Sequence, residues 1–398
     1  MPEEDRGPEP LRHRSARGGH ESGFPAPATP GPRRPVPGRV LLLLLVAGCA
    51  SGGGPAPDAA PSAAEAGAGP QRVNSPWPIR TRAHVDLWLH GFAMVQDDTT
   101  QVPYFRPGYR ERMVARKNSQ NVATLLESNR EQLRARLAVN RDLVGAQFLA
   151  LQFENWDVMQ QAIQYFLVAE GNPGRASNPE IQNVIATFAS IFPAAADREW
   201  LRTFVLSLRD EETKFYRAHW LAEHRDRERV ILRLDSLWEN DVRPKLTRYL
   251  NNTQLQRGEF LLSMPLDGEG RTLTGARTVI TTTYPETPDA AIEAIYVFMH
   301  EAIIPVSSVA VNDNTTPAEK RAGLAERYTS AAAVIGGGML LERIAPELAP
   351  GYARYYLRST AAGTVGADPE AALARTFQLP AVIRDAMSRQ LDLVLGGI

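Results

Sequence analysis

Residues 258–265, GEFLLSMP, and residues 274–284, TGARTVITTTY, are the two stretches that decide the fold class. Both are rich in aliphatic, aromatic and β-branched side chains, which favour strands. They flank a glycine-rich stretch, DGEGR, at residues 267–271. Two such runs around a glycine-rich turn predict a β-hairpin. Strand signals are concentrated in this region, so the expected sheet is small.

Helical patterns dominate the rest of the chain from Trp77 onward. The run Asn178-Pro179-Glu180 matches an N-cap, a first-position proline and an acidic first turn, which predicts a helix that continues to about Phe192. A long charge-rich helical region follows at residues 196–250. We therefore expect an α+β fold, mainly helical, in which a small antiparallel sheet (a hairpin near residues 258–284) packs beside a helix that carries His300 and Glu301.

Composition excludes several classes of protein. The chain has 398 residues, a formal net charge of −1 and one cysteine. A chain that is close to neutral offers no general electrostatic grip on nucleic acid, so no nucleic-acid partner is expected. One cysteine cannot form a disulfide scaffold or a cysteine-ligated metal site.

The single cysteine, Cys49, closes an apolar run, VLLLLLVA, at residues 40–47. Arg33, Arg34 and Arg39 precede this run, and a serine and three glycines follow the cysteine after Ala50. A basic flank, a short apolar stretch and a small-residue exit are typical of a secretory signal. Eight apolar residues are too few to cross a bilayer, which needs about 20 in a helix.

The stretch VAGC at residues 46–49 resembles a bacterial lipobox. The resemblance implies a lipoprotein signal peptide at residues 1–48, a covalent lipid on Cys49, and anchoring of an extracytoplasmic protein to the cell envelope. Residues 49–74, rich in alanine, glycine and proline, then form a flexible linker to one helix-rich globular domain at residues 75–398. Ala50, which is not aspartate, favours the outer membrane in a diderm organism. The long leader leaves a later start at Val36 or Val40 as an alternative.

The stretch YVFMHEAIIP at residues 296–305 resembles the first half of the zincin metallopeptidase motif, HExxH, in which two histidines bind zinc and the glutamate is the general base. The resemblance covers about residues 258–345. It implies His300 as a metal ligand, Glu301 as the catalytic base and zinc as the cofactor. The chain departs from the motif at Ile304, which cannot bind a metal, and Pro305 ends or kinks the helix.

A later helix supplies a further ligand in one class of zincins, and Glu326 is the best-spaced candidate, with Glu342 as another. Alternatively, the segment that corresponds to this ligand-bearing part of the later helix is the apolar stretch at residues 331–334. A third ligand would come from elsewhere in the chain. The candidates on the long helical region are His219, Glu223 and His224.

Two functions remain open. The first is a membrane-anchored lipoprotein with a divergent zincin-like domain, which is either a zinc-dependent peptidase acting on a peptide or protein substrate or an inactive relative. The alternative is a non-enzymatic helical envelope lipoprotein that binds a protein, peptide or glycan partner. An unrelated buried helix end would also explain the His300-Glu301 pair.

Overall fold

A computed structural model describes residues 75–97, 102–275, 278–358, 360 and 368–396. The predicted signal peptide, Cys49 and the predicted linker lie outside these residues. The strands are β1 (Ile79–Thr81), β2 (Gly258–Ser263), β3 (Arg271–Leu273) and β4 (Thr278–Thr283). The α-helices are α1 (Ala83–Val95), α2 (Tyr109–Ser119), α3 (Leu125–Ser128), α4 (Arg130–Val139), α5 (Trp156–Val168), α6 (Pro179–Ile191), α7 (Ala195–Glu211), α8 (Arg217–Asp226), α9 (Glu228–Ser236), α10 (Arg243–Asn252), α11 (Ile292–Ala302), α12 (Ile304–Asn314), α13 (Pro317–Arg321), α14 (Leu324–Ile344), α15 (Ala349–Leu357), α16 (Pro369–Thr376) and α17 (Ala381–Val394).

The fold is α+β and mainly helical, with a mixed four-stranded sheet in the order β1-β2-β4-β3. β1, β2 and β4 are parallel, and only β3 runs antiparallel to its neighbour β4. The hairpin predicted between the two β-rich runs is therefore wrong. Those runs form β2 and β4, which pair in parallel over six residues, from Gly258 opposite Thr278 to Ser263 opposite Thr283.

The glycine-rich stretch does not form a tight turn because its backbone bonds to another segment. The amides of Asp267 and Gly268 donate to the carbonyls of Tyr104 and Pro103, at 2.7 and 3.1 Å. After this stretch the chain returns through β3, which runs antiparallel to β4, so β2 and β4 point in the same direction. We call residues 267–270 the Asp267 loop.

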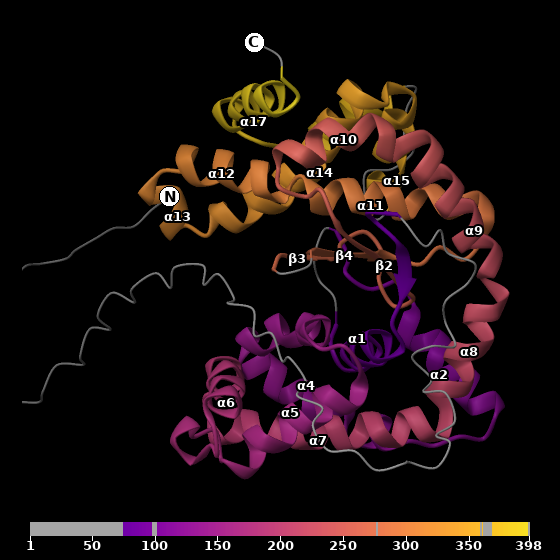
Figure 1. The fold of residues 1–398 in the computed structure, drawn as a ribbon, viewed down its shortest axis with the longest axis vertical. Helices are drawn as coiled ribbons and strands as arrows, with labels where there is room; N and C mark the ends of the chain where they lie inside the picture. Colours follow the sequence, from indigo (N-terminus) through magenta and orange to yellow (C-terminus); the bar gives the residue numbers. More distant parts are fainter. Residues whose placement is uncertain (1–74, 98–101, 276–277, 359, 361–367, 397–398) are drawn as a thin grey trace, which may run out of the picture. The chain divides into compact units, whose positions relative to one another are not determined.

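Helix α11 packs against β4, as the sequence predicts for the helix that carries His300 and Glu301 (Figure 1). It ends at Ala302, and α12 restarts at Ile304 with Pro305 in its first turn. Among the described residues, Pro288–Asn314 is long and apolar enough to span a membrane, yet 78% of its most apolar window is buried. Such burial is typical of a core helix.

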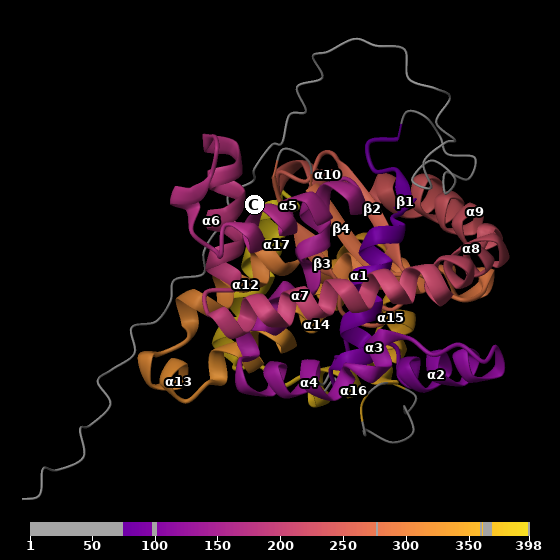
Figure 2. The ribbon, with the colours of Figure 1, turned by 90° about the horizontal axis from the view of Figure 1, so that it is seen from below.

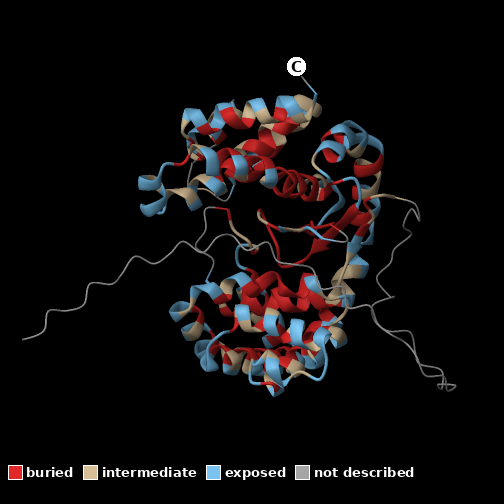
Figure 3. Cartoon of the chain, turned by 60° about the vertical axis from the view of Figure 1, so that its left-hand side comes forward, coloured by how far each residue is buried: buried red, intermediate tan, exposed pale blue. Residues whose placement is uncertain are grey.

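The buried apolar residues form one core cluster in which aromatic rings join the sheet to the helices. Phe260 on β2 lies 4.9 Å from the ring of Phe298 on α11, and Trp238 packs against both rings. Figure 3 shows the buried residues along the sheet and on the inward sides of the helices.

Helices α7 and α8 are joined by a π-helical turn, η3 (Glu212–Tyr216), so residues 195–226 continue as one long helix (Figure 2). This helix packs against α1, α3 and α4. A second π-helical segment, η4 (Leu237–Val242), separates α9 from α10. π-turns are rare and are often found at functional sites.

Candidate functional site

His300 and Glu301 lie at the end of α11, and their side chains are only 2% and 1% exposed. His300 Nδ1 and Glu301 Oε1 are 3.0 Å apart, and the amide of Gly270 donates to the same oxygen at 3.1 Å. Burial by itself lowers the pKa of His300, but the hydrogen bond and charge of Glu301 outweigh it and raise that pKa above its ordinary value of 6.5.

The donor set around His300 does not fit a catalytic zinc site. His300 Nε2 and Glu301 Oε2 are buried without a hydrogen-bond partner. A further metal-ligating side chain beside these two atoms would be needed to complete a zinc site. However, the described parts of the chain contain no group of three His, Cys, Asp or Glu side chains that could hold a metal. A catalytic zinc needs about three protein ligands.

The other predicted ligands lie elsewhere. Glu326 is exposed in the first turn of α14, whereas the part of α14 next to Ile303 is Gly336. Ten helical residues span about 15 Å, so Glu326 lies well away from the end of α11. Glu342 is also exposed. His219, Glu223 and His224 all belong to α8.

In this structure, Glu301 holds the Asp267 loop. Besides its bond from Gly270, its backbone carbonyl accepts from the Thr272 hydroxyl at 3.3 Å. From α15, the hydroxyls of Tyr355 and Tyr356 donate to the carbonyls of Asp267 and Gly268, at 3.1 and 3.0 Å. The buried pair and the two tyrosines together fix the loop, whose first residue faces a groove on the surface.

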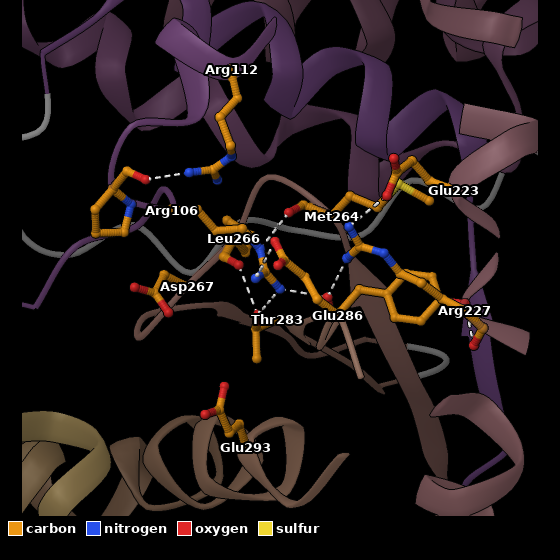
Figure 4. A network of polar contacts seen from close by, with 12 residues as sticks. Arg106, Arg112, Glu223, Arg227, Met264, Leu266, Asp267, Thr283, Glu286 and Glu293 are labelled. Carbon is orange, nitrogen blue, oxygen red and sulfur yellow. Dashed lines mark hydrogen bonds and ion pairs between the residues drawn. The ribbon is translucent and has the colours of Figure 1, made fainter. Parts of the chain in front are cut away.

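That surface feature, which we call the arginine groove, consists of two adjoining cavities of about 330 and 320 Å³. Both cavities are lined by Arg106, Arg112 and Glu286. The other charged or titratable lining residues are Tyr109, Arg116, His219, Glu223, Asp226, Arg227, Asp267 and Arg358. Figure 4 shows six of the charged residues, which come from separate segments: Arg106, Arg112, Glu223, Arg227, Asp267 and Glu286.

Arg106 lies at the centre of the groove and is fixed by the backbone. Its amide donates to the Pro265 carbonyl at 2.9 Å, and its Nε donates to the Met264 carbonyl at 2.8 Å. Nη2 donates to the Thr283 hydroxyl at 2.8 Å and to the Tyr284 carbonyl. The guanidinium side chain is only 13% exposed, and Nη1 is directed to Glu286 (Figure 4).

Two guanidiniums meet at one carbonyl oxygen. The Tyr284 carbonyl also accepts from Arg227 Nη1 at 2.8 Å, and the Tyr284 hydroxyl donates back to the Arg227 carbonyl at 3.2 Å. Burial and the neighbouring Arg227 charge lower the pKa of Arg106 below its ordinary value. The fold thus holds like charges together, an arrangement that an anion would stabilise.

Arg112 adds a cation to this pair. It lies in the first turns of α2, four residues after Gly108, whose φ of +69° suits glycine. Its Nη1 donates to the Pro107 carbonyl at 2.7 Å, and it forms no ion pair with any residue that the structure describes. Its guanidinium is exposed and available to a ligand.

The remaining arginines of the groove already have carboxylate partners. Arg227 and Arg116 donate to the two oxygens of Glu223, at 2.8 and 2.7 Å. Burial alone would raise the pKa of Glu223, but these hydrogen bonds lower it to about 2. At the other end of the groove, Arg358 bonds Asp267 at 2.6 Å. Among the described residues, Arg112 is therefore the arginine of the groove without a carboxylate partner, and the contact of Arg106 with Glu286 is the longest of the other pairs.

The sequence prediction missed this groove because its residues come from separate parts of the chain: the segment before α2, α2 itself, α8 and the residue after it, the Asp267 loop, the segment after β4, and the end of α15. One local signal exists. Four arginines occur within eleven residues, at 106, 110, 112 and 116, and a proline and a glycine follow the first. Such a cluster favours an anion-binding role, although its neighbours become visible only in the fold.

Comparisons with known proteins give no relative from which a role could be taken: no family model, no curated protein and no solved structure matches the chain.

Proposed function

We propose that the chain is an extracytoplasmic, lipid-anchored envelope lipoprotein whose helical domain binds an anionic ligand in the arginine groove, without catalysing a reaction. The observation that carries the proposal is the shared Tyr284 carbonyl, which holds Arg106 and Arg227 together while Arg112 lies nearby without a carboxylate. Guanidinium groups recognise carboxylates and phosphates through two parallel hydrogen bonds. The proposal develops the alternative predicted from the sequence, a non-enzymatic envelope lipoprotein that binds a partner.

Replacement of Arg112 tests the binding site. We expect Arg112→Gln to weaken anion binding roughly tenfold or more, because a charge-assisted hydrogen bond contributes about 1.5–3 kcal/mol. Isothermal titration of the full chain with inorganic phosphate and with succinate measures the loss. Arg202→Gln is the matched control, since Arg202 is an exposed arginine on α7 whose one ion pair among the described residues is with Glu199. Equal affinity in the Arg112→Gln and wild-type chains would contradict the proposal.

The lipid anchor is tested separately. Cys49→Ala removes the thiol that the lipobox resemblance assigns to acylation, and we expect the chain to move from the washed membrane fraction to the soluble fraction. Two or more acyl chains anchor a protein stably, so the shift should be nearly complete. Ala50→Ser is the control and should stay with the membrane. A Cys49→Ala chain that remains in the membrane fraction would contradict the lipoprotein assignment.

The peptidase alternative is distinguished by elemental analysis. A zinc-dependent peptidase would carry about one zinc per chain and lose hydrolysis in Glu301→Gln. The binding proposal requires neither. Stoichiometric zinc in the purified full chain would therefore favour the zincin-like function.

A further inference from the structure

Glu286 is placed as a built-in counter-anion for the centre of the groove. It follows β4 by three residues, and its Oε1 lies 3.4 Å from Arg106 Nη1 (Figure 4). Among the described residues, Glu286 is the only acceptor for Nη1. The two side chains differ sharply in exposure, with Glu286 57% exposed and Arg106 13% exposed.

This ion pair is weak compared with the others in the groove. At 3.4 Å the contact is longer than a normal hydrogen bond between charged groups, which is about 2.7–2.9 Å. An ion pair with an exposed partner contributes about 0–1 kcal/mol. By contrast, the other three bonds that the Arg106 side chain donates go to the fixed acceptors Met264, Thr283 and Tyr284. The guanidinium is therefore held in place without Glu286.

We infer that Glu286 occupies the ligand position in the free protein and that an oxyanion, either a carboxylate or a phosphate, displaces it from Arg106. This inference rests on the proposed function and names both the ligand chemistry and a specificity residue. The ligand oxygen replaces the carboxylate of Glu286 at Nη1 and reaches the guanidinium of Arg112, which lines the same cavities. A neutral or cationic ligand gains nothing by this exchange.

The consequence is that Glu286 lowers affinity. An anion must displace a carboxylate and then lie beside its negative charge, which disfavours binding. Glu286→Gln keeps the shape of the side chain and removes that charge. We expect Glu286→Gln to bind inorganic phosphate and succinate with a Kd about three- to tenfold lower than that of the wild-type chain.

Asp289→Asn provides the matched control. Asp289 lies three residues after Glu286, outside the lining of the groove; it is exposed, and the described residues give it no ion pair. Removing its charge changes the general electrostatic field near the groove but frees no arginine. We expect Asp289→Asn to change Kd by less than about twofold. The comparison separates release of Arg106 from general attraction.

Titration calorimetry of the four full-length chains gives distinguishable outcomes. Tighter binding in Glu286→Gln alone, lost again in the Arg112→Gln and Glu286→Gln double variant, supports the inference. Equal affinity in Glu286→Gln and wild type, or equal gains in Glu286→Gln and Asp289→Asn, overturns it while the binding function stands. If none of the chains binds either anion, the proposed function itself fails. Comparison of the Kd for phosphate with the Kd for succinate then identifies which oxyanion the groove prefers.

Discussion

Glu211→Gln should lower the free energy of unfolding by about 3–5 kcal/mol, because it breaks a buried ion pair. Lys117 and Glu211 are each 0% exposed, with Nζ 2.9 Å from Oε1. His90 Nε2 lies 3.0 Å from the same carboxylate oxygen. The variant leaves the buried Lys117 with Glu127, which is 29% exposed, as its remaining carboxylate. Urea unfolding monitored by circular dichroism measures the change.

The pH dependence gives a second reading of the same network. Burial alone would raise the pKa of Glu211, but the hydrogen bond from His90 and the charge of Lys117 lower it to about 2, from an ordinary value of 4.5. Because the pKa of Glu211 is lower in the folded state than in the unfolded state, its ionised form stabilises the fold above pH 4.5. This contribution to the free energy of unfolding is lost as the pH falls toward 2. The difference between wild type and Glu211→Gln should therefore shrink over that range.

Glu199→Gln is the control for this variant. Glu199 lies on the same helix, is 58% exposed and pairs with Arg202, so its loss should change stability by less than about 0.5 kcal/mol. If Glu211→Gln behaves like Glu199→Gln, the buried network does not hold α7 to α2.

Gly270→Ala should cost about 3 kcal/mol or more, or prevent folding. A Cβ at this position would lie 1.9 Å from the backbone oxygen of Thr281, in the middle of β4. Backbone in a paired strand cannot move aside as a side chain can, and overpacking typically costs 1–3 kcal/mol and occasionally more. The displaced Asp267 loop would also disturb one end of the arginine groove. Thermal unfolding, followed by phosphate titration of any folded variant, measures both effects.

Gly145→Ala provides the comparison. A Cβ there would have no atom within 4 Å, so we expect a change of less than about 1 kcal/mol, with stabilisation as the favoured sign. Equal melting temperatures for the two alanine variants would show that the loop is not packed against β4 as described.

Local sequence signals predict the elements better than their pairing. The N-cap at Asn178, whose side chain accepts from the Ile181 amide at 2.8 Å, and the helix break at Pro305 both depend on neighbours within four residues. The parallel pairing of β2 with β4 instead goes with a connection that returns through β3 and bonds to residues 103 and 104, more than 160 positions away. No local pattern contains that information.

The candidate site shows the same division. The position of His300 and Glu301 on an apolar helix beside the sheet could be predicted, because helix and motif are local. What their side chains contact could not, since Gly270 approaches from another segment. The catalytic role of Glu301 stays a prediction. Arg106 and Arg227 are brought together at the Tyr284 carbonyl, which lies far along the chain from both arginines. The residues next to each arginine therefore do not predict the pair.

The π-turn between α7 and α8 has a consequence for recognising distant homologues. A π-turn holds about one residue more than an α-turn, so η3 shifts the angular phase of everything after it by about 100°. Without that extra residue, Glu211 could still face Lys117, but His219 and Glu223 would rotate off the groove. In an alignment, a one-residue deletion within residues 212–216 would therefore identify homologues that retain the fold but have lost the anion-binding groove.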